Sequence, residues 1–448
     1  MTHKERISRR RSILQPFEGI LGNVGIVLSS NAVIAGLGFL TLAFASQALG
    51  PAGLGILVLS EAYARAFDTL LRLEPTQALI REGTRHRSAE DRGPFLRLVK
   101  FGLTLDVVGS VGAAVLAMVT LGYVAGWFGF GDDEINYALM FCAAMLVPAP
   151  TTMIGLFRLF SRFKAYSKTL VFSAALRAAA AGILLLTGAG LEEFVVLTAI
   201  MVAVERSLPT LLGWAILRGH VGPGLFRTRL SGVVAENPGL WRFIVMVNMN
   251  AQARSSIRRY DVIALGTLIA PAEMGLYIIA RRIAMVLFRI GAPLQLVAYP
   301  RICELVNDGK IQRMVKMVLA VCGMFLLSSA IAVAAYLAVG PYLLVKIFGD
   351  AYSGATTLVL YQLIGACLLL SSTILNAALQ ALRREGRLLA ISIAASLSFF
   401  LPLPFVVPAA GVLGASLLHM VVGLTWCVGA GLIFYRALSS ASLTPKDA

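Results

Sequence analysis

Charged residues are scarce in this chain, and their scarcity excludes most soluble protein classes. Asp, Glu, Lys and Arg make up 14% of the 448 residues, whereas hydrophobic residues make up 58%, and the mean hydropathy is +0.81. A soluble domain carries about 25% charged residues. The chain also lacks a polar stretch long enough to fold as a separate soluble domain. These features predict a membrane protein.

Cysteine and histidine are also rare, which removes several kinds of active site. The five cysteines show neither metal-ligand spacing nor a disulfide framework, and no nucleophile–base constellation or glycine-rich phosphate loop is present. His419 is the one histidine within an apolar run, where a hydrogen-bonded packing role is favoured over proton transfer. We expect no enzyme activity, catalytic residue, metal or cofactor, and coupling to a proton or sodium gradient stays open.

Apolar runs of roughly 20 residues recur along the chain, each long enough to cross about 30 Å of hydrocarbon. The expected fold is an all-α polytopic membrane protein with about twelve helices. The predicted spans are 20–47, 51–74, 101–125, 136–157, 169–189, 191–217, 243–267, 271–297, 317–339, 354–380, 388–407 and 409–435. They give a cytoplasmic tail, an N-terminal lobe, a cytoplasmic linker, a C-terminal lobe and a second tail, at residues 1–19, 20–217, 218–242, 243–435 and 436–448.

Basic residues are strongly biased to one side of the predicted membrane. With both termini inside, the inner segments hold 28 Lys or Arg and the outer loops hold one, Lys346. Such a bias is the positive-inside pattern of polytopic proteins. It accounts for most of the net charge of +16, so the basic balance does not indicate a nucleic-acid partner.

The chain contains an internal repeat. PAGLG at 51–55 recurs as PAEMG at 271–275, and both segments begin a predicted span after a short outer loop. Two six-helix halves have the same orientation in the membrane, so their pseudo-twofold axis lies along the membrane normal. Repeats of this kind are typical of transporters, with the substrate site between the halves.

The predicted spans contain ten arginines and six acidic residues away from the outer ends. Each uncompensated charge at the bilayer centre costs on the order of 3 kcal/mol. These side chains must therefore pair, reach the interface or face a water-filled cavity. The stretch SEAYARAFDTLLRLEP at 60–75 shows the pattern best, because its four charges at steps of 4, 3 and 4 share one helix face.

Two interpretations of these charges stay open. They are either salt bridges that hold helices together, or the lining of a cationic cavity that binds an anionic substrate, with pyrophosphate favoured because arginine grips phosphate in a fork-like manner. The candidate substrate-binding residues are Arg65, Arg177, Asn250, Arg254, Arg258, Arg282 and Arg289. The candidate ion-coupling or pairing residues are Glu61, Asp68 and Asp261.

Three segments resemble a known family. They are SQALGPAGLGILVLSEAYARAFDTLLRL near the start, RRYDVIALGTLIAPAEMGLYIIARRIA in the second half and VKIFGDAYSGATT before the tenth span. Together they resemble polysaccharide-transport proteins, the flippases of O-antigen or exopolysaccharide repeat units, over about residues 20–435. The resemblance implies a MATE-like fold of two six-helix lobes forming a V, with alternating access across a bacterial inner membrane. Asp261 matches the aspartate of the family's seventh helix.

The resemblance implies the transport of a lipopolysaccharide or exopolysaccharide repeat unit linked to polyprenyl pyrophosphate, with polysaccharide polymerase or export machinery as a further partner. Three alternatives are weighed against it. A multidrug cation antiporter would have an acidic or aromatic cavity, and a lipid II flippase would have two more spans. A membrane-embedded glycan polymerase or ligase would need a large outer loop, which this chain lacks.

Overall fold

The computed structural model describes residues 3–87, 93–221, 224–225 and 227–441. Within these ranges, the side chains of residues 3–24, 26–28, 216–221, 250, 254, 287–297, 385 and 440–441 are not described. Helices are the only regular structure in the described part of the chain, so the predicted all-α class is confirmed. The α-helices are α1 (His3–Leu71), α2 (Thr76–Arg87), α3 (Gly93–Val124), α4 (Asp132–Met145), α5 (Thr151–Leu159), α6 (Phe163–Thr187), α7 (Leu191–Val221), α8 (Val233–Glu236), α9 (Leu240–Gly266), α10 (Pro271–Asn307), α11 (Ile311–Phe348), α12 (Ala355–Ala381), α13 (Glu385–Phe400) and α14 (Leu403–Ala441). The short 3-10 helices are η1 (Ala125–Phe128) and η2 (Asp350–Tyr352).

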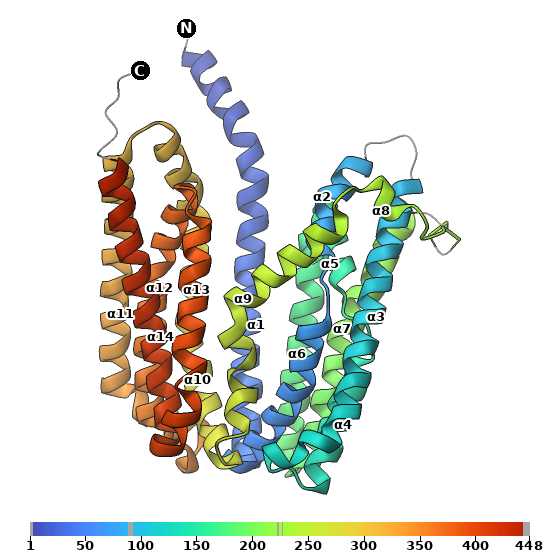
Figure 1. Cartoon of the computed structure of the whole chain (residues 1–448), viewed down its shortest axis with the longest axis vertical. Helices are drawn as coiled ribbons and strands as arrows, with labels where there is room; N and C mark the ends of the chain where they lie inside the picture. Colours follow the sequence, from blue (N-terminus) through green and yellow to red (C-terminus); the bar gives the residue numbers. More distant parts are fainter. Residues whose placement is uncertain (1–2, 88–92, 222–223, 226, 442–448) are drawn as a thin grey trace.

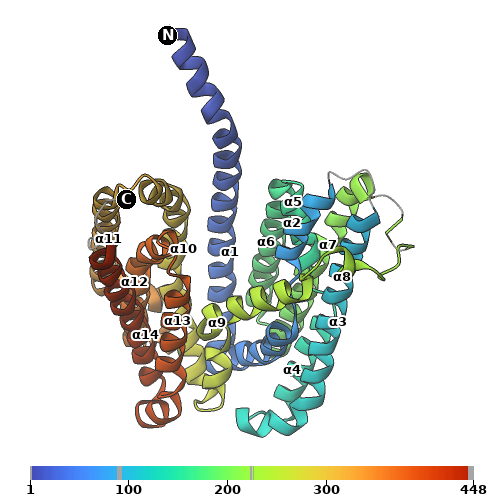
Figure 2. The same ribbon diagram turned by 45° about the horizontal axis from the view of Figure 1, so that its top comes forward.

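The helices form two bundles arranged as the predicted V (Figure 1). The second part of α1 lies with α2 to α7 in the N-terminal lobe, and α10 to α14 form the C-terminal lobe. α9 runs from beside α2 to the end where the lobes meet, and we count it with the C-terminal lobe because it contacts α10 and α13. The first part of α1 stands between the bundles in both views (Figure 2). We call the end where the lobes meet the contact end, and the end that carries both chain termini the terminal end.

Two glycines with positive φ bend long helices. Gly50, with φ 63° and ψ −178°, separates the first and second predicted spans within α1, and Gly411, with φ 57° and ψ −151°, divides α14. A side chain with a Cβ atom rarely adopts these angles. Glycine at both positions therefore lets the chain turn without a longer loop.

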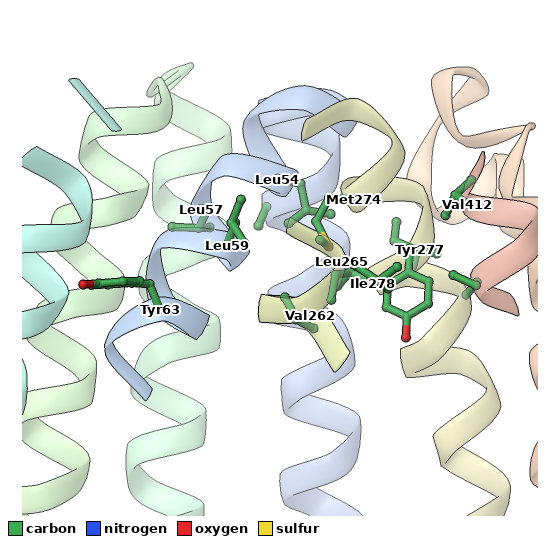
Figure 3. Packing of buried hydrophobic residues seen from close by; sticks show 14 of the residues in the cluster. Leu54, Leu57, Leu59, Tyr63, Val262, Leu265, Met274, Tyr277, Ile278 and Val412 are labelled. Carbon is green, nitrogen blue, oxygen red and sulfur yellow. The ribbon is translucent and has the colours of Figure 1, made fainter. Parts of the chain in front are cut away.

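The two copies of the repeated motif cross each other at the contact end. A Cβ atom at Gly55 would lie 1.8 Å from the carbonyl oxygen of Pro271, and one at Gly275 would lie 2.1 Å from that of Pro51. The contact is therefore reciprocal, as expected for a pseudo-twofold axis between the lobes. Leu54 and Met274 pack beside the crossing (Figure 3).

A second repeated feature lies at the terminal end, where α5 leads to α6 and α12 leads to α13. The Arg162 N–H donates to the carbonyl of Phe157 at 2.8 Å, and the Arg384 N–H donates to that of Leu379 at 2.9 Å. The residue before each arginine has a positive φ, of 53° or 56°. The same corner thus recurs after 222 residues, close to the offset of the first motif.

Seven segments of the described chain are long and apolar enough to cross a membrane, and the first of them, Ser29–Leu71, contains the turn at Gly50 and so two predicted spans. The other four predicted spans are not among these seven segments, and the structure shows why each one is too polar or too short. α9 and α10 carry arginines, and α13 has 16 residues. The span predicted at 136–157 is two helices, α4 and α5, because Pro148 and Pro150 remove backbone donors. The span predicted at 388–407 breaks after Phe400, just before Pro402.

Candidate functional site

The first two charges of the ladder on α1, Glu61 and Arg65, lie toward the region between the lobes. Arg65 is paired with Glu61 at 2.5 Å, and their side chains are 47% and 18% exposed. The charges of Arg177 on α6 and Arg282 on α10 also act on the Glu61 carboxylate. One carboxylate thus pairs with Arg65 and lies within the electrostatic reach of an arginine from each lobe, which relates four of the predicted site residues.

Arg177 has a second acidic neighbour. Its guanidinium lies 3.1 Å from the Glu205 carboxylate on α7, which ties α6 to α7 inside the N-terminal lobe. The charge of Glu205 also acts on Arg65. The N-terminal side of the interlobe region is thus a network in which every arginine has a carboxylate close by.

Deeper in the same lobe, Asp68 joins two arginines. Arg72 and Arg206 each lie 2.7 Å from its Oδ2 atom, and Asp68 itself is buried. Arg206 also donates from Nη1 to the carbonyl oxygen of Val147, at 3.1 Å, in the break between α4 and α5. This aspartate is therefore engaged in helix packing rather than facing the lobe interface.

The start of α5 is held by an acid. Asp106 on α3 accepts hydrogen bonds from the Thr151 hydroxyl and, at 2.8 Å, from the Thr152 N–H, and Ser110 accepts one from the Ala149 N–H at 3.0 Å. A carboxylate at a helix N-terminus and a guanidinium at the preceding C-terminus both complement the helix dipole. Side chains of α3 and α7 thus supply several of the polar partners of this break.

Among the described side chains of the C-terminal lobe, Asp261 is the one buried carboxylate. Asp261 on α9 has a side chain with 0% exposure, and its Oδ2 lies 2.8 Å from Arg281 Nε. The Tyr277 hydroxyl also donates to Oδ2 at 2.8 Å. The same hydroxyl lies 2.6 Å from His419 Nε2 on α14, so the network ties together three helices.

The other arginines of α9 and α10 have fewer acidic neighbours. Arg258 and Arg282 are exposed, and the backbone carbonyl of Arg258 accepts a 2.6 Å hydrogen bond from Arg281 Nη2. Among the described side chains, no carboxylate forms an ion pair with Arg258. Three more predicted site residues have side chains outside the described set, namely Asn250, Arg254 and Arg289.

The structure separates residues that the sequence grouped together. Asp68 and Asp261 hold Arg72, Arg206 and Arg281 rather than the arginines near the lobe interface. In this conformation these two acids therefore pair with arginines outside the candidate substrate-binding set.

Tyr277, Arg281, His419 and Arg206 were not among the predicted site residues. Each lies within an apolar helix, Arg206 beside Glu205 and Arg281 beside Arg282, and nothing in the sequence identifies its partner on another helix. Among the described residues, no group of three or more His, Cys, Asp or Glu side chains could hold a metal ion.

Solved structures with this arrangement of helices are membrane transporters. The lipid II flippase MurJ in an inward closed conformation superposes with a TM-score of 0.70 at 11% identity, covering 93% of this chain and 90% of that one. An inward-facing multidrug resistance MATE family transporter of the MOP superfamily gives 0.68 at 14% identity, covering 91% and 94%. The fold is that of this class of multi-pass transporters.

The family follows from the sequence match. Residues 20–306 match the family described as "Polysaccharide biosynthesis protein", and the chain belongs to that family. The Inner membrane protein YghQ of Escherichia coli (strain K12) is 26% identical over 293 residues, which are 64% of this chain and 81% of that protein. Fold and family together describe a multi-pass helical membrane protein of the polysaccharide biosynthesis family.

Proposed function

We propose that this protein moves a polyprenyl-pyrophosphate-linked oligosaccharide, a repeat unit of lipopolysaccharide or exopolysaccharide, from the inner to the outer leaflet of a bacterial inner membrane. The pyrophosphate is held by arginines between the lobes while the sugar crosses and the lipid tail stays in the bilayer. The family and the flippase among the similar structures support this substrate class. The positive-inside bias supports a terminal end and both chain termini in the cytoplasm.

One observation carries the proposal. Arg65 of the N-terminal lobe and Arg282 of the C-terminal lobe both act on Glu61, and Arg258 is exposed without an ion-paired carboxylate among the described side chains. A diphosphate cannot enter hydrocarbon bare, so arginines must replace its water through charge-assisted hydrogen bonds. Because the lobes meet at the contact end, the substrate enters from the terminal end.

The proposal also accounts for release. Glu61 already neutralises part of the charge of Arg65 across 2.5 Å. A substrate phosphate competes with this carboxylate, so the grip on the substrate is weaker than that of unpaired arginines. A change in the distance between the lobes would separate Arg282 from Glu61 and lower the positive potential further.

The test is flipping in proteoliposomes that contain a polyprenyl-pyrophosphate-linked oligosaccharide, followed by the access of an added glycosidase to the sugar. Arg258→Ala should reduce the flipping rate by roughly tenfold or more. Arg258→Lys should keep part of the rate, because lysine retains the positive charge but cannot form the bidentate hydrogen bonds of a guanidinium. Arg301→Ala is the matched control, since Arg301 pairs with Glu304 on the surface. Wild-type flipping by Arg258→Ala would contradict the proposal, and uptake or efflux of an organic cation instead would favour the multidrug antiporter.

A further inference from the structure

A pocket of about 560 Å³ lies between α13 and α14 at the terminal end of the C-terminal lobe. Its rim carries Arg384 and Arg387 at the start of α13 and Arg436 near the end of α14, and its floor is apolar, with Ile391 and Ile433. Volumes of this size suit a small-molecule ligand or part of a larger one. The combination of three guanidinium groups with an apolar floor favours an amphipathic anion.

The described carboxylates do not neutralise the charge of this pocket. None of its arginines forms an ion pair with a described acidic side chain, whereas Arg301 and Lys310 at the same end of the lobe each have a partner. The sequence adds one acid, Glu385, whose side chain lies outside the described set. Three arginines and one glutamate leave a net charge of +2.

The pocket faces away from the other lobe. On α13, Ser396 contacts Ser256 of α9 at 2.8 Å, so that side of the helix faces the middle of the molecule. Arg387 precedes Ser396 by nine residues, which at about 100° per residue places it on the opposite side. The pocket is therefore separate from the interlobe site proposed for the transported substrate.

The surface next to the pocket is apolar. Ala390, Ile391 and Ala394 of α13 and Ile433 of α14 line the pocket beside the arginines, and Leu432, one turn before Arg436 on α14, is 55% exposed. In a protein that spans the membrane, such residues contact acyl chains, and basic residues at the ends of the same helices lie at the headgroup level.

We propose that this pocket binds the phosphate headgroup of an anionic phospholipid of the surrounding membrane, with its acyl chains lying along α13 and α14. The contact with acyl chains favours a phospholipid over free phosphate. The orientation away from the other lobe favours a resident lipid over the transported one.

The two lobes share the same backbone corner, but the arginines of the pocket are not all repeated in the N-terminal lobe. After the offset of 222 residues, Arg162 corresponds to Arg384, but Ala165 corresponds to Arg387. The second arginine of the pocket is therefore present in one lobe only. The N-terminal corner has the same backbone turn and carries Arg158, Arg162, Lys164 and Lys168, but no arginine at the position of Arg387, so it serves as an internal control.

The experiment measures lipids retained by the purified full chain in native mass spectrometry, after incubation with cardiolipin, phosphatidylglycerol or phosphatidylcholine. The variant R384A/R387A/R436A removes the rim, and R158A/R162A/K164A removes three basic residues from the corresponding N-terminal corner. Each basic residue contributes roughly fivefold to the binding of anionic lipid. We expect the first variant to lose the preference for cardiolipin and phosphatidylglycerol by roughly 100-fold and the second to keep it.

Equal retention by both variants, with matching melting temperatures, would overturn the proposal. Displacement of the bound lipid by millimolar inorganic phosphate or pyrophosphate would identify a site for free phosphate instead. Displacement by a polyprenyl-pyrophosphate-linked sugar, but not by phosphatidylglycerol, would assign the pocket to the transported lipid. The binding readout needs no transport, so its failure leaves the proposed flippase function intact.

Discussion

The two lobes share a backbone plan but distribute their charges differently. Away from the outer ends of the predicted spans, the N-terminal lobe has five acidic residues and four arginines, and the C-terminal lobe has one acidic residue and six arginines. In the N-terminal lobe, Glu61, Asp68 and Glu205 form ion pairs with arginines. In the C-terminal lobe, the single acid Asp261 forms an ion pair with Arg281.

This difference assigns different roles to the lobes in the proposed mechanism. Paired charges in the N-terminal lobe hold helices together and neutralise one another, so they add little net attraction for an anion. The arginines of α9 and α10 exceed the acids around them, so the C-terminal lobe supplies most of the positive potential. Internal symmetry of the fold therefore does not carry over into symmetry of charge.

The largest expected effect comes from breaking the pairing in the N-terminal lobe. Arg206→Ala leaves buried Asp68 with one partner and removes the donor to Val147, and the loss of one partner of a buried pair costs about 3–5 kcal/mol. The free energy of unfolding in detergent should fall accordingly. Arg65→Ala, which breaks a pair with an arginine that is 47% exposed, should have a clearly smaller effect. Equal losses would show that burial does not distinguish the two pairs.

The crossing between the lobes gives the next effect. Gly55→Ala puts a methyl group 1.8 Å from the carbonyl oxygen of Pro271, and overpacking of this kind costs about 1–3 kcal/mol. The lobes should separate at the contact end, which spin labels at Asp132 and Ala351 would detect as longer distances. Gly112→Ala is the control, because no atom lies within 4 Å of its added Cβ. Unchanged distances in Gly55→Ala would contradict a tight crossing.

A smaller effect is expected in the network of the C-terminal lobe. His419→Leu removes the 2.6 Å hydrogen bond with Tyr277, which is worth about 1 kcal/mol, while Tyr277 keeps its bond to Asp261. His419→Gln retains a polar partner and should recover part of the stability. A melting temperature that falls equally in both variants would show that the ring packs against Phe399 rather than acting through its nitrogen.

Much of the fold could be predicted, because the length of the apolar runs and the distribution of Lys and Arg among the loops can be read directly from the sequence. The repeat was visible in PAGLG and PAEMG, and the structure adds why proline and glycine recur, since each glycine meets the other copy's proline. The break at residues 146–150 was not predicted, because its stability depends on Arg206 and Asp106 from other helices.

The candidate site was less predictable than the fold. Helix periodicity identified the local pairs Glu61–Arg65 and Asp68–Arg72, both four residues apart. It could not identify Asp261 with His419, which lie on different helices. Contacts within one helix follow from spacing, whereas contacts between helices require the packing of the whole lobe.

The central claim is that the arginine excess of the C-terminal lobe binds the anionic part of the substrate. It is tested most directly by the dissociation constant of a short-chain prenyl-pyrophosphate-linked sugar for wild type, Arg258→Ala and Arg177→Ala. Loss of a charge-assisted hydrogen bond should weaken binding by about tenfold or more in Arg258→Ala. Arg177→Ala should change it less, because Arg177 is paired with Glu205. Unchanged affinity in Arg258→Ala, or a greater loss in Arg177→Ala, would contradict the account.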